Sequence, residues 1–377
     1  MERKATVVHT DFPQDRRVLA ISDVHGNLPF LRGVLDKAGY GEDDILVLVG
    51  DLVEKGPDSL ATLRYVMELA RTRTVYALRG NCDNLVEDFT RADGEIGPAF
   101  YRHYLKVWGE RSLICQMGRA AGFPLRAQEE LPALRAVLRR HFAPELAFLS
   151  AMPVILETPD YLFVHGGVPG ETGLEELEAW SCMKNDEFLA QGHAFRRWCV
   201  VGHWPVTLYD PHIPSAAPLL ERERHIASID GGCVLKLDGQ LNALVLPRTA
   251  GGAFSWYSYD GLPKATALDP QTAGGDSVNI RWGRNRVEVL ERGPELSLCR
   301  HLETGRVLPI LTSYLYDSPE GLRCEDSTDY LLPVVPGDCL SIVARTGEMG
   351  TLVKKNGVTG WYRGRLNDET KRETKGT

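Results

Sequence analysis

Five short apolar runs in the first two thirds of the chain each end at a side chain that can bind a metal ion. The runs are RVLAIS, ILVLVG, VYALRG, YLFV and CVVG. In that order they lead to Asp23 and His25, to Asp51, to Asn81 and Asp83, to His165 and to His203. Because ligand crevices of layered α/β folds open at the carboxyl ends of the strands, we expect these side chains to converge. Asp and Asn also end strands as turn formers, which is the alternative for any one run taken alone.

The pattern around these runs predicts the fold class. Between about residues 17 and 247, runs rich in Val, Ile and Leu alternate with amphipathic stretches such as FLRGVLDKAG and SLATLRYVMELART. This alternation is typical of an α/β or α+β layered domain in which helices cover a β-sheet. At 377 residues with 43% hydrophobic side chains, the chain is long enough to contain a second domain.

Composition shifts divide the chain into four parts. We assign residues 1–248 to the domain that carries the five runs, and within it residues 84–150 form a mostly helical insertion. Residues 249–277 are rich in Gly, Ala, Thr and Pro without a clear period, which predicts a linker. Strand-like runs in residues 278–366 predict a small all-β domain, and the polar residues 367–377 predict a disordered tail.

Charge and cysteine content argue against several classes of function. The formal net charge of −8 gives no general attraction to phosphate backbones, so we expect no stable nucleic-acid binding. Eight scattered cysteines without a CxxC pair are too few for a disulfide scaffold and indicate a reducing, cytoplasmic compartment. No apolar stretch has the length of a membrane span and the N-terminus lacks the core of a signal peptide, so we expect no membrane association.

The chemistry of the converging side chains narrows the choice of metal. Two Asp, one Asn and three His supply hard oxygen and borderline nitrogen ligands without a thiolate, a set that suits Mn, Fe or Zn. A bridging carboxylate in such a set can hold two divalent ions, and a pair of ions activates a shared water against a bound phosphate. The residues therefore predict a dinuclear metal centre and phosphoester hydrolysis.

The motifs SDVHG, GDLVEKGP, RGNCD, HGG and GHWP, in this order and spacing, resemble the calcineurin-like metallophosphoesterase superfamily. They are most similar to its phosphoprotein-phosphatase branch, which also includes the bacterial symmetrical dinucleoside tetraphosphatases. The resemblance covers about residues 17–247 and extends to PELAFLSAMPVI and ASIDGGCVLKLDGQLNAL. It implies a metallophosphoesterase-type sheet core covered by helices, with a metal-bridging water as the nucleophile.

The resemblance also implies a metal-binding role for each motif. Asp23 and His25 would hold the first ion, Asp51 would bridge both ions, and Asn81, His165 and His203 would hold the second. Asp51, Asn81, Cys82 and Asp83 would form the catalytic set. Cys82 replaces a histidine that is thought to protonate the leaving group in this branch. A thiol in this place is either a proton donor or an inert small side chain, and we favour the inert side chain.

Three cations would bind the substrate phosphate. Lys55 stands where the branch has an arginine, and it lacks the bidentate fork of a guanidinium. Arg79 in the RGNCD motif and Lys184, which follows Trp180, complete the predicted phosphate-binding set. A solvated surface charge is the alternative for Lys55.

The leading prediction for the function is a Ser/Thr phosphoprotein phosphatase. One alternative is hydrolysis of dinucleoside polyphosphates of the Ap4A type or of another small phosphoester, which would call for a walled pocket with stacking aromatics. The few cations favour the phosphoprotein, because a tetraphosphate calls for more positive charge. The other alternative is a catalytically weak binding protein that acts through its C-terminal β domain.

The C-terminal stretch GVTGWYRGRL resembles the closing strands of bacterial SH3-like barrels. The resemblance implies that exposed aromatic side chains of the small β domain bind a peptide, a glycan or a protein partner. A packing or dimerisation module is the alternative for the same residues.

Overall fold

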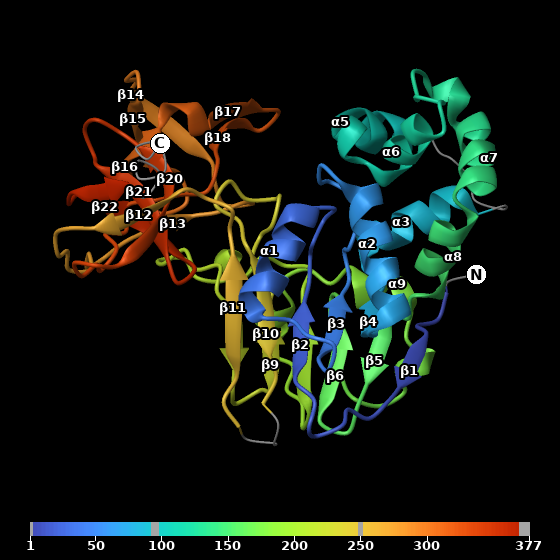
Figure 1. The fold of residues 1–377 in the computed structure, drawn as a ribbon. Helices are drawn as coiled ribbons and strands as arrows, with labels where there is room; N and C mark the ends of the chain where they lie inside the picture. The colour runs from blue at the N-terminus through green and yellow to red at the C-terminus, as the bar shows by residue number, and fades with distance from the viewer. Residues whose placement is uncertain (1–2, 92–97, 248–251, 369–377) are drawn as a thin grey trace, which may run out of the picture. The chain divides into compact units, whose positions relative to one another are not determined.

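The computed structural model describes residues 3–91, 98–247 and 252–368. These residues form two compact units, which are coloured along the chain in Figure 1. The first unit holds the described chain up to Trp204, together with Pro218–Leu235 and Gln240–Tyr259. The second unit holds Pro205–Ala217, Lys236–Gly239 and the described chain from Asp260 onward.

The first unit contains two β-sheets. One has the order β11-β10-β2-β3-β4, with β2 (Val18–Ile21), β3 (Ile45–Val49), β4 (Thr74–Leu78), β10 (Leu241–Val245) and β11 (Ser255–Tyr259). Strands β2, β3 and β4 run parallel, whereas β10 and β11 are antiparallel to their neighbours. The other has the order β1-β5-β6-β7-β9-β8, with β1 (Val7–His9), β5 (Ile155–Glu157), β6 (Tyr161–Val164), β7 (Trp198–Val201), β8 (Leu219–Glu221) and β9 (Ile226–Ser228).

Successive side chains of the central strands point to opposite faces of the sheet, so each strand contributes to two hydrophobic cores. On β2, Leu19 joins a core that includes Leu31 and Leu63 of the covering helices α1 (Leu28–Ala38) and α2 (Ser59–Thr72). Its neighbour Ala20 points to the opposite face, into a core that includes Phe163 of the second sheet. Strands buried on both faces read as continuous apolar runs, which is why these strands were recognisable. The predicted α/β layered fold is confirmed.

Local sequence signals set the ends of helix α1. The side chain of Asn27 accepts a hydrogen bond from the N–H of Phe30 at 3.3 Å, which satisfies one of the free amides of the first turn. The helix ends at Gly39, whose φ of 59° lies in the left-handed region that glycine enters without steric cost. The loop between β2 and α1 therefore has a defined length, and this loop carries two of the predicted metal ligands.

Helical segments form most of the described chain between β4 and β5, as predicted for the insertion at residues 84–150. They are α3 (Asn81–Thr90), α4 (Pro98–Phe100), η1 (Tyr101–Leu105), α5 (Lys106–Trp108), η2 (Gly109–Arg111), α6 (Leu113–Ala120), η3 (Gln128–Glu130), α7 (Leu131–His141) and α8 (Ala143–Ala151). Shorter helical turns follow at η4 (Leu174–Glu176), α9 (Ala179–Met183) and η5 (Phe188–Gln191). None of the helices in the described ranges has both the length and the apolar character of a membrane span.

Antiparallel strands build the second unit. Its largest sheet has the order β22-β21-β20-β12-β23, with β12 (Lys264–Ala267), β20 (Cys339–Arg345), β21 (Thr351–Lys355), β22 (Val358–Tyr362) and β23 (Leu366–Asp368). The smaller sheets contain β13 (Asn279–Ile280), β14 (Val287–Glu291), β15 (Leu296–His301), β16 (Val307–Leu311), β17 (Leu315–Ser318), β18 (Gly321–Cys324) and β19 (Ser327–Thr328). Two short helical turns, η6 (Val206–Leu208) and η7 (Thr312–Tyr314), accompany them. The small β domain expected from the sequence is present, and its likeness to an SH3-like barrel stays a prediction.

Three of the boundaries predicted from composition are wrong. The predicted linker at 249–277, of which 249–251 lie outside the described residues, contains strands β11 and β12, because the aromatic run SWYSY favours a strand despite its Gly-rich surroundings. The predicted disordered tail at 367–377 begins inside β23, whose residues pair with β12, and 369–377 lie outside the described residues. The segments 205–217 and 236–239, assigned to the first domain, pack in the second unit.

Candidate metal centre

The polar side chains that follow the central strands of both sheets of the first unit lie together. Nε2 of His25 is 3.8 Å from Oδ1 of Asp23 and 3.8 Å from Oδ2 of Asp51. Nε2 of His165 is 3.3 Å from Oδ1 of Asp51. All four side chains are buried. Residues more than a hundred positions apart in the chain thus meet at one site, as expected for strands whose carboxyl ends share an edge.

Asp51 occupies the middle of this cluster. Two groups of side chains each bring potential ligand atoms within 4.8 Å of one another, and the groups are His25, Asp51 and Cys82 on one side and Asp23, Asp51 and His165 on the other. Asp51 belongs to both groups and turns a different oxygen toward each histidine, which suits a bridging carboxylate. The grouping differs from the one implied by the family resemblance, which pairs Asp23 with His25.

His203 lies beside this cluster but makes other contacts. Its backbone N–H donates to Oδ2 of Asp23 at 3.0 Å, and its ring centroid is 5.2 Å from that of His165. Its Nε2 lies 2.8 Å from Oδ1 of Asp186 and 3.3 Å from Nζ of Lys184. The predicted phosphate-binding Lys184 therefore lies next to a predicted metal ligand. Asp186 was missed by the sequence analysis, because it lies in a loop without a motif.

The backbone at this site is strained. The φ angles of four predicted ligands lie in the left-handed region: 56° at Asp23, 48° at His25, 51° at Asp51 and 66° at His203. Non-glycine residues adopt such angles rarely and at a cost in free energy, and they cluster at functional sites. The chain therefore holds these side chains in place at the expense of backbone strain.

Two glycines allow the backbone to approach the carboxylates closely. A Cβ atom at Gly80 would overlap the carboxylate of Asp51, and a Cβ atom at Gly202 would overlap that of Asp23. Both glycines belong to the motifs RGNCD and GHWP. A larger residue at either position would displace a predicted ligand.

Several buried polar atoms at the site have no hydrogen-bond partner among the described residues. These atoms are Oδ1 of Asp23, Nδ1 and Nε2 of His25, Oδ1 of Asn81 and Nε2 of His165. Leaving so many buried polar atoms unsatisfied is costly, and native structures avoid it unless a water or an ion completes the site. Nδ1 of His165 lies 2.9 Å from the carbonyl of Val49, so a proton on Nδ1 leaves the lone pair of Nε2 free for a metal. The residues present fit a metal centre.

Electrostatics keep the central carboxylate ionised. Burial raises the pKa of Asp51, but the charge and hydrogen bond of His165, together with the charges of His25 and Lys55, outweigh it and hold the pKa well below its ordinary value. Burial lowers the pKa of His165, but Asp51 and Asp23 outweigh it and raise the pKa to about 10. Burial lowers the pKa of His25 to about 3. The cluster thus contains an ionised Asp51 whose charge is balanced either by a proton on His165 or by a divalent cation.

Cys82 lies inside the cluster as a buried thiol. Its backbone N–H donates to Oδ1 of Asp51 at 2.8 Å, and its Sγ accepts a bond from Nδ2 of Asn81 at 3.4 Å. Burial and the charge of Asp51 raise the pKa of Cys82 well above its ordinary value, so the neutral thiol is a weak acid. The assignment of Cys82 as an inert side chain stays a prediction.

Asp83, predicted to be catalytic, has a structural role in this chain. Its Oδ1 accepts hydrogen bonds from the N–H groups of Leu52 at 3.0 Å and Val53 at 3.2 Å. Its Oδ2 accepts a bond from the N–H of Gly80 at 2.8 Å. The carboxylate therefore ties the loop after β3 to the start of α3, and its oxygens are engaged by backbone amides.

Arg79, predicted to bind phosphate, is also committed elsewhere. Its NH2 group donates to the carbonyls of Leu149 at 3.2 Å and Ser150 at 2.7 Å, near the C-terminal end of α8. Its NH1 group forms an ion pair with Glu87. The guanidinium is buried and binds carbonyls at the helix end, and its phosphate-binding role stays a prediction.

Lys55 interacts electrostatically with the cluster, and its phosphate-binding role stays a prediction. Burial lowers the pKa of Lys55, but Cys82, Asp51 and Asp23 raise it above its ordinary value, so its ammonium group stays charged. Both Lys55 and the preceding Glu54 have left-handed φ angles, of 66° and 73°. The strained turn directs the lysine toward the carboxylates and away from a solvated surface position.

Asp230 is a buried carboxylate that the sequence analysis did not select. Its Oδ1 accepts a bond from the N–H of Gly232 at 2.8 Å, and its Oδ2 has no partner among the described residues. Burial and the charge of Asp23 raise its pKa well above the ordinary value. Asp230 follows strand β9 by two residues, so the signal of a polar residue at a strand end was available for it.

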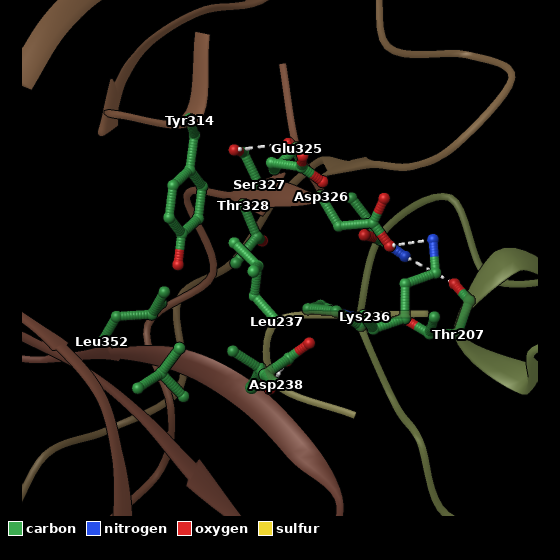
Figure 2. A pocket seen from close by; sticks show the side chains of 14 residues that line it. Thr207, Lys236, Leu237, Asp238, Tyr314, Glu325, Asp326, Ser327, Thr328 and Leu352 are labelled. Atoms are coloured by element: carbon green, nitrogen blue, oxygen red, sulfur yellow. Dashed lines mark hydrogen bonds and ion pairs between the residues drawn. The ribbon is translucent and has the colours of Figure 1, made fainter. Parts of the chain in front are cut away.

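A separate pocket lies within the second unit (Figure 2). Lys236 and Asp326 form an ion pair of 2.7 Å in its wall, and Asp238 accepts a hydrogen bond from Thr359. No group of potential metal ligands occurs here among the described residues. A partner for the β domain stays a prediction.

The chain is similar in sequence to known phosphoesterases. A model of the calcineurin-like phosphoesterase family matches residues 16–224, more than half of the chain. The chain is 29% identical over 181 residues to a symmetrical bis(5'-nucleosyl)-tetraphosphatase of Cellvibrio japonicus, covering 47% of this chain and 54% of that protein. It is 24% identical over 238 residues to the asymmetrical bis(5'-nucleosyl)-tetraphosphatase PrpE of Oceanobacillus iheyensis, covering 57% and 83%.

Among solved structures, the chain is similar to a metallophosphoesterase from Sphaerobacter thermophilus. The TM-score is 0.37 and the sequence identity is 19%, and the match covers 65% of this chain and 87% of that one. The chain spans about half the length of several curated relatives that it matches.

Proposed function

The chain belongs to the calcineurin-like phosphoesterase family, whose members use a dinuclear metal centre, and from this premise we propose that it hydrolyses phosphoesters at the cluster around Asp51. The observation that carries the proposal is the set of buried nitrogen and oxygen atoms without hydrogen-bond partners in that cluster. Atoms of this kind are costly to bury unless a bound ion satisfies them.

Six residues would hold the ions: Asp23, His25, Asp51, Asn81, His165 and His203. When bound, two divalent ions, which the oxygen and nitrogen ligands suit as Mn, Fe or Zn, supply Lewis acidity to the phosphate and to the attacking water. The protein keeps Asp51 ionised between the two positions. Several of these ligands have φ angles in the left-handed region, and this backbone conformation would hold their side chains in place for the ions.

Lys55 and Lys184 would bind the substrate phosphate. Lys55 is the better placed of the two, because its charge acts directly on the carboxylates of the cluster. Lys184 is paired with Asp186, so its charge is partly cancelled. Cys82, as a neutral thiol with a raised pKa, would not supply the proton for the leaving group.

Dinucleoside polyphosphates are the first candidate substrate class. The curated relatives with which the chain shares 24–29% identity carry the name bis(5'-nucleosyl)-tetraphosphatase. Ser/Thr phosphoproteins, the leading prediction from the sequence, are the second candidate. The commitment of Arg79 to helix α8 favours this second class, because it leaves few cations for a bridge of four phosphates.

A metal-loaded activity screen tests the proposal. The full chain, stripped of ions with a chelator and reloaded separately with Mn²⁺, Fe²⁺ or Zn²⁺, would be assayed on an aryl phosphate, a phosphothreonine peptide and diadenosine tetraphosphate. We expect hydrolysis that requires the ion and disappears again with the chelator. Tight binding of two ions without turnover of any substrate would favour the binding-protein alternative, and activity that survives chelation would contradict the proposal.

A further inference from the structure

The segment from Tyr101 to Trp108 in the helical insertion has an unusual conformation. The chain winds as a π-helix over Tyr101–Leu105 and continues as the short helix α5, Lys106–Trp108. π-Helical turns are rare and are frequent at functional sites. At the end of this segment Val107 is 68% exposed and Trp108 is half-buried, so two large apolar side chains remain at the surface.

Trp108 is linked to the candidate metal centre by Lys55. The ammonium group of Lys55 lies over the indole ring of Trp108, 5.9 Å from the ring centroid. The same group interacts electrostatically with Cys82 and Asp51. A cation at this distance from an indole face is attracted to it. Lys55 therefore lies between the aromatic wall that Trp108 forms and the side chains of the candidate metal centre.

A hydrogen-bond network from Glu54 holds this wall in place. The buried carboxylate of Glu54 accepts bonds from the hydroxyl groups of Tyr104 at 2.8 Å and Ser112 at 3.1 Å. The ring of Tyr104 contacts that of Trp108, with centroids 6.5 Å apart, and stacks on Phe100 at 5.5 Å with planes 7° apart. Glu54 immediately precedes Lys55, so this one residue holds in place both the lysine and the aromatic side chains of Tyr104 and Trp108.

We propose that Trp108 and Lys55 form a subsite for the group attached to the reacting phosphate, and that this group is the base of a nucleoside. The proposal rests on the proposed function of phosphoester hydrolysis. Stacking on an aromatic face is available to every base, and Lys55 supplies the charge for the adjoining phosphate. A phosphothreonine peptide without an aromatic side chain gains nothing from the indole face.

The test compares two substrates on variants of Trp108. For the manganese-loaded full chain, kcat/KM would be measured for diadenosine tetraphosphate and for a phosphothreonine peptide without aromatic residues, and the ratio of the two compared. Trp108→Leu, which keeps an apolar side chain but removes the ring, should lower this ratio by about 10-fold or more. Trp108→Phe should keep the ratio within about threefold, since it retains an aromatic face.

A matched control is Trp256→Leu, which removes a tryptophan that is 41% exposed on strand β11. The ratio for this variant should equal that of the wild type. A ratio unchanged in Trp108→Leu, or a wild-type chain that hydrolyses the peptide and not the dinucleotide, overturns the nucleoside subsite and leaves phosphoester hydrolysis standing. If the metal-loaded wild type hydrolyses neither of these substrates nor an aryl phosphate, the proposed function itself is overturned.

A measurement on the wild type guards against a Trp108→Leu variant that fails to fold. Inhibition of the hydrolysis of an aryl phosphate would be compared for adenosine monophosphate and inorganic phosphate. We expect the nucleotide to inhibit at a concentration about 10-fold lower, because only the nucleotide can stack on Trp108. Equal inhibition by the two compounds would contradict the subsite.

Discussion

At the scale of single residues, Asp51 lies at the centre of the candidate metal site. It turns one oxygen toward His25 and the other toward His165, and its charge sits in a buried cluster. Asp51→Asn keeps the shape but removes the charge shared by both candidate metal positions. We expect the metal content after dialysis to fall below one ion per chain and kcat/KM for an aryl phosphate to fall by at least about 100-fold.

The measurement is elemental analysis of the dialysed protein together with steady-state kinetics. The matched control is Asp15→Asn, at an exposed aspartate, which should retain both the ions and the activity. Two ions bound to an active Asp51→Asn protein would rule out the bridging role.

The second prediction for single residues concerns Arg79 and Lys55. Both were predicted to bind the substrate phosphate, but in the structure they make different contacts. Arg79→Met leaves the carbonyls of Leu149 and Ser150 without a donor, so the free energy of unfolding should fall by about 1–3 kcal/mol with KM unchanged. Lys55→Met removes the cation at the cluster, so kcat/KM should fall by about 10- to 100-fold. Urea unfolding and kinetics on an aryl phosphate check both variants. A rise in KM for Arg79→Met equal to that for Lys55→Met would restore Arg79 as a phosphate ligand.

The sequence predicted the metal ligands better than it predicted the contacts of Arg79 and Asp83. The ligands that follow β2, β3 and β6 were predictable because an apolar run and the polar residue after it are local features. The carbonyls bound by Arg79 lie about 70 residues away in α8, and two of the amides bound by Asp83 belong to the loop after β3. No local pattern records such contacts, so the motif predicted which residues lie near the site but not which of them face it.

At the scale of elements, helix α6 is joined to the loop after β3 by one carboxylate. Glu54 accepts bonds from the N–H of Leu113 at 2.6 Å, from Ser112 and from Tyr104. Burial raises the pKa of Glu54 from 4.5 to about 7, against the lowering effect of these donors. A carboxyl whose folded-state pKa is raised contributes its full stability below its unfolded pKa and loses that contribution as the pH rises through the folded pKa.

We therefore expect the wild type to lose stability relative to Glu54→Gln as the pH rises from about 4.5 to about 7, and the difference to level off above that. The measurement is urea unfolding of both metal-free proteins at intervals across this range. A difference in the free energy of unfolding that is independent of pH would contradict the raised pKa.

The elements themselves were predicted unevenly, for physical reasons. Strands β2 and β3 are buried on both faces and read as continuous apolar runs, and α1 has both a side-chain cap and a terminal glycine. Strand β11 is an edge strand, half-exposed and flanked by Gly and Ala, so its composition resembled a linker. Burial on one face only, or at an edge, weakens the periodic signal on which such predictions depend.

At the scale of the whole molecule, the sequence separates a layered α/β part from a β part but misplaces the chain between them. Pro205–Ala217 lies within the stretch that resembles the phosphoesterase domain, yet it packs in the second unit. Membership of a unit depends on contacts distant in sequence, such as the bond from the N–H of Ala216 to the carbonyl of Gly357 at 2.8 Å. Composition carries no information about such pairs.

We expect the metal centre to depend on the second unit, since Pro205, which belongs to that unit, follows His203 by only two residues. The side chain of Asn279 donates to the carbonyls of Thr207 at 2.9 Å and Asp210 at 2.8 Å, which fixes the segment after His203. Asn279→Ala should lower the free energy of unfolding by about 1–3 kcal/mol in urea titrations. A chain ending at residue 259 loses all of these partners and should bind ions more weakly than the full chain in calorimetric titration. Equal affinity in the two chains would show that the first unit holds its metal ligands alone.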